Sequence, residues 1–243
     1  MTEKEINDQV AQKVAWNIAA ADHYTLLALL LQIPDPSTAE MLIDPRLVED
    51  YRAILSELGG DDAEADALAE RFGAMQRNLT EEESPLSVVR QEYTRAFAHP
   101  RRPPIKIYEA LFVDDERAMA GKEISYARLF VSPAAMDAER QYARAGVRCD
   151  NSEKRISADC ITTELQFMAH LHTLMAKSLI EEDLEKASCV EEWMDDFKEK
   201  HVRQWMPRFF ERCVEETQHD FYRLTGEMGL TLMKLVGMDA GRA

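Results

Sequence analysis

The segment between Pro133 and Pro207 contains no proline, and its apolar residues recur every three or four positions. This interval places side chains on one face of a helix, whereas the side chains of a strand alternate between two faces. Because no proline interrupts the backbone hydrogen bonds, helices of several turns can form here. The clearest apolar stripe consists of Ile161, Leu165, Met168, Leu171 and Met175. The segment therefore predicts long helices that pack through one apolar face.

The rest of the chain is also expected to be helical, because no stretch shows the strict alternation of a strand. Nine glycines and nine prolines in 243 residues are few for the many turns of a β-sandwich or barrel. We expect an all-α fold, a single globular bundle of roughly ten helices. The expected helices cover residues 5–31, 47–58, 63–75, 84–98, 107–113, 123–145 with a break at Pro133, 190–205, 207 onward and 221–236.

Local signals place some of the boundaries. Thr80 is expected to cap the helix that follows it, with the glutamates at 81–83 in the first turn. Pro207 is expected in the first turn of a new helix, where its missing N–H has no partner to lose. The proline-rich stretch 99–104 is expected to be a loop, and residues 116–121 are expected to be a connection.

Residues 1–243 are expected to form one domain, since the chain has no internal repeat and no low-complexity tract. The polar stretch 146–155 is expected to be a loop, and a hinge there would separate an N-terminal from a C-terminal helical subdomain. Such a hinge would also allow two copies to exchange their C-terminal bundles. The sequence leaves open whether the protein is a monomer or a domain-swapped dimer.

The formal net charge of −16 limits the classes of partner. A nucleic-acid binder needs cations for the phosphates, and an anionic membrane surface repels acidic chains in the same way. A negative field attracts positively charged ligands, so the charge favours a cationic partner. The alternative is that the acidity only keeps the protein soluble.

Several features are typical of a cytoplasmic protein. The start Met1–Glu5 is acidic, whereas a secretory leader begins with a basic stretch. The apolar run Leu26–Leu31 is much shorter than the ~20 residues that span a bilayer, so no stable membrane insertion is expected. The four cysteines form no Cys-x-x-Cys pair, which is typical of reduced, packed thiols rather than of a zinc or redox site.

The residue patterns of common catalytic sites are missing from the sequence. The glycines form no phosphate-binding or dinucleotide-binding pattern, and there is no Gly-x-Ser-x-Gly elbow. A carboxylate-bridged di-iron site needs two Glu-x-x-His pairs, and only Glu216 and His219 form one. His170 and His172 are two positions apart, which points them to different faces of a helix. We therefore expect no enzyme activity, no catalytic residue, no metal and no cofactor.

Three segments combine acidic and aromatic residues at helical spacing. The first is Glu92–Phe97, followed by Pro100 and by Tyr108–Ala110. The second is Asp159–Met168, which reads D-C-I-T-T-E-L-Q-F-M. The third is Phe197–Phe209, which reads F-K-E-K-H-V-R-Q-W-M-P-R-F.

In this order the three segments resemble the TorD/DmsD/NarJ group of redox-enzyme maturation chaperones. They are similar to the family patterns E-Y-x-x-L-F with Pro and Y-E-S, P-D-H-I-x-x-E-L-x-F-M, and F-x-x-x-H-x-x-x-W-x-P-x-F. The likeness extends over about residues 14 to 236. It implies a TorD-like all-helical, cytoplasmic chaperone without a catalytic site. It also implies a client, the catalytic subunit of a molybdenum oxidoreductase, often bound through its twin-arginine export leader.

The chain departs from the family pattern at three places. Ala158-Asp159-Cys160 stands where the family has Pro-Asp-His, so the carboxylate is present and the imidazole is absent. Ala96 replaces a leucine and Ala110 replaces a serine. Because the Asp-His pair is associated with leader binding in the family, these changes indicate a divergent member with a client of its own.

A receptor for two arginines followed by an apolar helix needs carboxylates beside an apolar groove. Arginine suits carboxylates because its two parallel N–H groups match two oxygens. The predicted peptide-binding residues are Glu92, Tyr93, Phe97, Tyr108, Glu109, Asp159, Cys160, Glu164 and Phe167.

Each of these residues also has a purely structural interpretation. Tyr93, Phe97 and Phe167 lie on apolar stripes, which normally face the core. Glu92 and Glu164 could pair with Arg90 or Arg95 inside the fold. Asp159 could simply cap the helix that follows it.

Two alternatives to an export-leader chaperone stay open. The protein could assemble a nitrate-reductase-type catalytic subunit that is not exported, which the altered Asp159-Cys160 pair makes credible. It could also be a helical enzyme or a binder of a small molecule, such as GTP or the pterin cofactor, although no phosphate loop supports this. The sequence does not identify the client.

Overall fold

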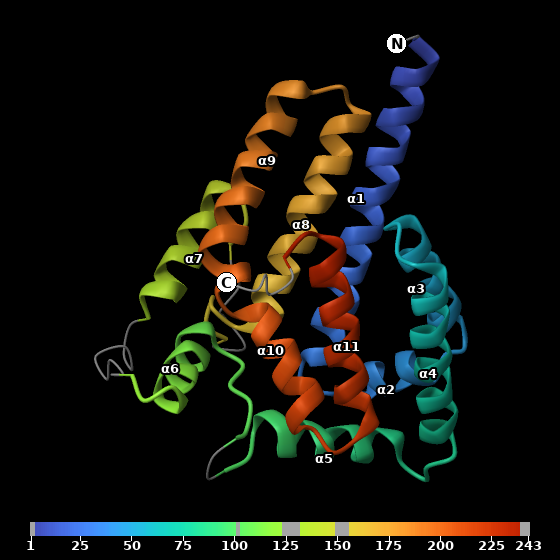
Figure 1. Cartoon of the computed structure of the whole chain (residues 1–243), viewed down its shortest axis with the longest axis vertical. Coiled ribbons are helices and arrows are strands. Elements are labelled where there is room, and N and C mark those ends of the chain that lie inside the picture. Colours follow the sequence, from blue (N-terminus) through green and yellow to red (C-terminus); the bar gives the residue numbers. More distant parts are fainter. Residues whose placement is uncertain (1–2, 101–102, 123–131, 149–155, 239–243) are drawn as a thin grey trace.

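The computed structural model describes residues 3–100, 103–122, 132–148 and 156–238, and these residues form an all-α bundle (Figure 1). The described part has no β-strand; it has one isolated antiparallel bridge, between Tyr108 and Cys160. The expected fold class is therefore confirmed. The helices are α1 Glu3–Leu31, α2 Pro36–Ile43, α3 Arg46–Glu57, α4 Asp62–Thr80, α5 Pro85–Phe97, α6 Glu109–Met119, α7 Pro133–Arg144, α8 Ile161–Ile180, α9 Leu184–Phe197, α10 Arg203–Glu216 and α11 Asp220–Leu235, with a π-helical turn, η2, at Lys198–Val202.

Helices α1 and α8 lie side by side and form the centre of the bundle (Figure 1). Their contact buries the apolar stripe that the sequence predicts for α8, including Leu165, Met168 and Leu171. His172 of α8 stacks on Tyr24 of α1, with ring centroids 5.5 Å apart. The contact joins two segments that are far apart in the sequence, so it ties the N-terminal half of the chain to the C-terminal half.

The stretch Asn7–Leu31 of α1 is long and apolar enough to cross a bilayer, judged by length and composition alone. Most of it is buried inside the protein. Buried side chains at its C-terminal end, such as Leu27, Leu30 and Leu31, belong to the core. The hydrophobicity of α1 is therefore explained by packing within the bundle.

Helices α10 and α11 form a closely packed antiparallel pair beside α1 (Figure 1). The two helices come this close because α11 has glycines, Gly226 and Gly229, where it faces α10. A Cβ atom at Gly229 would lie 2.1 Å from the ring of Phe210, and one at Gly226 would lie 2.8 Å from the Phe210 carbonyl oxygen. Because both helices are held by this close contact, residues on α10 keep a fixed position relative to the core.

The chain runs from α9 into α10 without a loop, and this differs from the prediction that Pro207 begins a helix. The π-helical turn at Lys198–Val202 joins the two helices, and Pro207 lies inside α10. Proline there removes a backbone hydrogen bond. The helix continues through Pro207 because its neighbours Trp205, Met206 and Phe209 are buried in the core. The local preference of proline for a helix start is thus overridden by packing.

Other boundaries also differ from the predictions. Thr80 is the last residue of α4, where its hydroxyl donates to the Gln76 carbonyl, and α5 begins instead after Ser84. Helix α6 continues to Met119, through residues that were expected to be a connection. Helix α2 was not predicted, although Asp35 caps it with a capping box.

Most of the remaining predicted helices are confirmed. Helices α1, α3 and α11 agree with the expected ranges within two residues, and α4 extends five residues beyond its expected end at Met75. Helix α7 begins at Pro133 after the cap Ser132; residues 123–131 of the expected helix lie outside the described part. The expected hinge at 146–155 also lies mostly outside it, so the subdomain division stays a prediction.

Candidate functional site

Two of the three motif segments meet in a short antiparallel contact. The N–H of Glu109 donates to the Asp159 carbonyl over 2.8 Å, and the N–H of Ile161 donates to the Ile107 carbonyl over 2.9 Å. This pairing sets the first turns of α6 and α8 beside one another. The side chains at these two helix starts, together with those of the third motif, form a cluster that we call the buried junction; its polar members are Glu109, Asp159, Glu164, His201 and Trp205.

Asp159 supports the start of α6, not that of α8. Its Oδ2 lies 3.3 Å from the backbone N–H of Ala110 and 3.2 Å from the hydroxyl of Ser132, and its Oδ1 accepts from Ser157. The residue at the N-cap of α8 is Cys160, which makes no side-chain cap. The suggestion that Asp159 caps the following helix is therefore wrong. Its carboxylate joins α6 to the residue that precedes α7.

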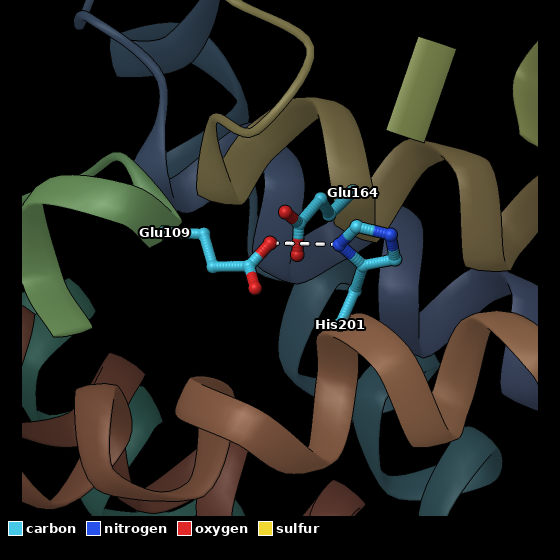
Figure 2. A group of neighbouring side chains, drawn as sticks. All are labelled: Glu109, Glu164 and His201. Atoms are coloured by element: carbon cyan, nitrogen blue, oxygen red, sulfur yellow. Dashed lines mark hydrogen bonds and ion pairs between the residues drawn. The ribbon is translucent and has the colours of Figure 1, made fainter. Parts of the chain in front are cut away.

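Glu109 forms a buried ion-pair contact with His201 of the π-helical turn (Figure 2). Its Oε2 lies 2.7 Å from Nδ1 of His201, and Nε2 of the same ring lies 3.2 Å from Oδ2 of Asp137. Burial opposes ionisation of Asp137, but hydrogen bonds from Gln141, Arg140 and His201 lower the pKa of Asp137 to about 2. The imidazole thus lies between two carboxylates, from α6 and α7.

Glu164 lies beside this pair (Figure 2). Its Oε2 accepts the indole N–H of Trp205 over 2.9 Å. Burial, and next the negative charge of Glu109, raise the pKa of Glu164 well above its usual value. Two adjacent buried carboxyl groups cannot both ionise cheaply. Oε1 of Glu164 meets no N–H or O–H donor, so this oxygen is suited to carry a proton. The hydrogen bonds of the junction join α6, α8, the π-helical turn and α10.

The same side chains meet the geometric requirement for a cation. One ligand atom each from Glu109, Glu164 and His201 lies within 4.8 Å of the others. Carboxylate oxygen and imidazole nitrogen are ligands for zinc and similar ions. However, both ring nitrogens of His201 and one oxygen of Glu164 already have protein partners. Hydrogen bonding accounts for the arrangement, and the sequence prediction of no metal stays a prediction.

The aromatic residues predicted for binding are core residues. Tyr93 and Phe97 pack against Tyr222, with ring centroids 6.3 and 4.9 Å away. Burial raises the pKa of Tyr93 to about 12, consistent with a hydroxyl held away from bulk water. Phe167 of α8 packs against Tyr142 of α7, with ring centroids 4.5 Å apart. The structural interpretation of these three residues is confirmed.

The remaining predicted residues divide between the junction and its surroundings. Tyr108 and Cys160 face one another across the β-bridge, and Tyr108 is half-buried. Burial raises the pKa of the Cys160 thiol, whose sulfur lies 3.4 Å from the hydroxyl of Thr162. Glu92 pairs with Arg95 one turn later in α5, as its structural interpretation anticipated.

The carboxylates that were expected to receive arginine are shielded from solvent. Glu109 is 6% exposed, Asp159 2% and Glu164 0%. Each has partners within the fold, so a client guanidinium does not reach them in this conformation. The structure thus brings the three carboxylates together, as predicted, but beneath the surface rather than on it.

Two junction residues, His201 and Trp205, and two charged residues that contact other parts of the bundle, Asp137 and Arg212, were missing from the predicted site. His201 and Trp205 are four positions apart in the third motif, and this spacing alone would have placed them on one helix face. Asp137 has no comparable local signal. Arg212 is also buried: its guanidinium contacts Asp115, Glu116 and Glu216 and fixes α10 to α6. Contacts between residues so far apart in the sequence, such as Arg212 and Asp115, are found only in the tertiary structure.

Comparison with protein-family models matches residues 61–211 to the family described as nitrate reductase delta subunit. The match covers more than half of the chain and includes all the residues of the buried junction. No curated protein sequence matches the chain.

Proposed function

This chain belongs to the nitrate reductase delta subunit family, and from this we propose that it binds the leader or the partly folded form of one molybdoenzyme subunit. The family is one of NarJ/TorD-type maturation chaperones, which makes the chain a molybdoenzyme assembly chaperone. In the proposed function it holds the catalytic subunit before cofactor insertion and, where the client is exported, before export. The observation that carries the proposal is the family match across all the junction residues.

The chemistry of the junction supports binding rather than catalysis. Its ionisable groups are buried and hydrogen-bonded to one another. A general acid or base must reach a substrate proton, which these groups do not do in the described conformation. The junction instead fixes the relative positions of α6, α8 and α10, as a binding scaffold requires.

We propose further that two of the predicted residues, the junction carboxylates Glu109 and Glu164, contact a client only after the junction opens. An arginine reaches Glu109 or Glu164 if the segment Ile107–Glu109 separates from Asp159–Ile161. Two backbone hydrogen bonds hold these segments together. Asp159→Asn would weaken the contact to Ala110, so this variant should change leader binding if opening is part of the cycle.

A second candidate client is a nitrate-reductase-type catalytic subunit that is not exported. The family of nitrate reductase delta subunits, to which the chain belongs, favours this client. So does Cys160, which stands where the resembling family has a histidine associated with leader binding. For either client we propose a cytoplasmic protein, acting as a monomer or as a domain-swapped dimer.

Co-expression with candidate clients tests the proposal. The catalytic subunit of the molybdoenzyme encoded nearest to this chain would be produced with and without it, and the molybdenum and pterin content of the subunit measured. We expect a large loss of cofactor content without the chain, and co-purification of the chain with the cofactor-free subunit. Full cofactor content in its absence, for every molybdoenzyme of the same genome, would refute the assembly role. Deleting the N-terminal leader of the client separates the two candidates, because only the export-leader version predicts loss of binding.

A further inference from the structure

An open groove of about 570 Å³ lies between α1 and α3. This is within the range of ~300–1,000 Å³ that is typical of ligand sites. It is separate from the buried junction and shares no residue with it. Its lining comes mainly from α1 and α3, with Met41 of α2, and includes the apolar side chains of Ile18, Leu26 and Ile54.

The charged side chains that line the groove are all acidic. They are Asp22, Asp50 and Glu57, and no lysine or arginine of the described residues lines it. Partial burial, and next the charge of Asp50, raise the pKa of Asp22, so these two carboxylates repel one another. The groove therefore presents negative charge at its rim, with no cation in its lining.

Two other cavities of the described part contain their own cations. The groove between α8 and α9 is lined by Lys13 and Lys198 as well as by Glu191 and Asp195. The cavity between α4 and α11 is lined by Arg71 and Glu227, which form an ion pair with one another, and by Lys234 and Glu64, which form a second. The α1–α3 groove differs from both because no lysine or arginine lines it, although the charge of Arg46 acts on Asp50 from outside the lining.

The floor of the groove is apolar and suited in length to a short helix. Leu26 and Tyr51 are buried beneath it, while Ile18 is 47% exposed. At about 1.5 Å of rise per residue, the lining from Ala15 to Leu29 extends about 21 Å, or four helical turns. A third helix laid between two neighbours would bury this apolar strip, as in known helix-in-groove complexes.

We propose that the α1–α3 groove binds a cationic amphipathic helix, with two basic side chains at Asp22 and Asp50 and an apolar face on Ile18 and Ile54. Charge complementarity selects this occupant, because the rim has three carboxylates and no cation. The inference rests on the proposed function, in which the client offers a segment with two arginines followed by an apolar stretch. It differs in placing that segment on an open surface, where no part of the junction has to move.

Calorimetry with a defined peptide tests the groove. The probe is a synthetic helix-forming peptide of about twenty residues with two adjacent arginines before a leucine–alanine stretch, and its counterpart has glutamine at both positions. We expect the double variant Asp22→Asn with Asp50→Asn to weaken binding at least about fivefold. The matched control, Glu191→Gln with Asp195→Asn, removes the same charge from the α8–α9 groove and should change binding less than about twofold.

A second variant tests the apolar floor without changing charge. Ala53 is exposed on α3 and lines the groove, so Ala53→Trp should fold while filling the space. We expect it to weaken peptide binding about tenfold or more, because the added ring excludes the guest helix. Circular dichroism and thermal unfolding check that each variant keeps its fold.

Three results would overturn the inference: no binding of the arginine peptide to the unaltered protein, equal weakening by the two charge variants, or no effect of Ala53→Trp. None of them bears on the co-expression test. If cofactor insertion depends on the chain but the groove variants bind the peptide normally, the assembly role is supported and binding of the peptide in the α1–α3 groove is refuted. If the groove variants lose the peptide but insertion never depends on the chain, the groove stands and the assembly role fails.

Discussion

Trp205 donates its indole N–H to Oε2 of Glu164 over 2.9 Å, and both side chains are buried. The bond joins α8 to α10 across forty-one positions of sequence. Glu164 also lies close to Glu109, so the Trp205–Glu164 bond brings α8 and α10 together beside the first turn of α6. The two residues thus belong to the centre of the buried junction, and their replacement has predictable consequences.

Glu164→Ala is expected to lower the free energy of unfolding by about 3 kcal/mol, because it leaves a buried indole N–H without an acceptor and opens a cavity. Glu164→Gln keeps an acceptor for Trp205 and adds a donor toward Glu109. We expect its change to stay within about 1 kcal/mol at neutral pH. Urea unfolding of both variants makes the comparison. Equal losses for alanine and glutamine would show that the hydrogen bonds of Glu164 do not matter.

The raised pKa of Glu164 predicts a dependence of stability on pH. The folded state holds a proton that the unfolded state releases above the ordinary value of 4.5. The stabilising contribution of the protonated group is therefore complete below that value and is lost as the pH rises toward the folded-state pKa. Glu164→Gln has no such proton, so its stability should fall less as the pH rises above about 4.5. Parallel pH profiles for the two proteins would contradict the assignment of the proton.

Two buried histidines predict that the folded protein loses stability as the pH falls, which is the opposite of the effect of Glu164. Burial lowers the pKa of His23 to about 3 and that of His172 to about 3, from the ordinary value of 6.5. The unfolded state takes up protons below 6.5 that the folded state refuses, so stability is lost as the pH falls from 6.5 toward 3. Each histidine contributes up to about 1.4 kcal/mol per pH unit in this window. His23→Phe, whose ring can keep the contact with Tyr51, should flatten the acid limb of the unfolding profile. An unchanged limb would show that His23 does not resist protonation.

Gly229→Ala is expected to destabilise the protein by about 2 kcal/mol or more, although alanine favours helices. The new methyl group would overlap the ring of Phe210 and force α10 away from α11. Gly73→Ala in α4 is the matched control, because a Cβ atom there meets neighbours no closer than 3.5 Å. We expect Gly73→Ala to stabilise by about 0.5–1 kcal/mol. Thermal unfolding decides the matter: similar shifts for both substitutions would mean that the α10–α11 contact is looser than the structure indicates.

The sequence by itself determined the fold class and the helices with strong apolar stripes. The stripe from Ile161 to Met175 and the range of α11 were correct because helical periodicity is a property of neighbours three or four positions apart. The predictions at Thr80 and Pro207 were wrong because a cap or a helix start is only a weak local preference. At Pro207 the burial of Trp205 and Phe209 outweighs this preference, and α10 continues through the proline.

Only the tertiary structure decided what the acidic residues do. The sequence identified Glu109, Asp159 and Glu164 as candidate site residues. It did not predict that Glu109 contacts His201, that His201 contacts Asp137, or that Glu164 contacts Trp205, because these residues come from distant segments. It predicted carboxylates open to a cationic client, whereas these are buried and an exposed acidic rim lies at Asp22 and Asp50. Composition fixes how many charges a chain has. Which of them face water depends on how distant helices pack, because a carboxylate leaves solvent only where the fold supplies partners for it.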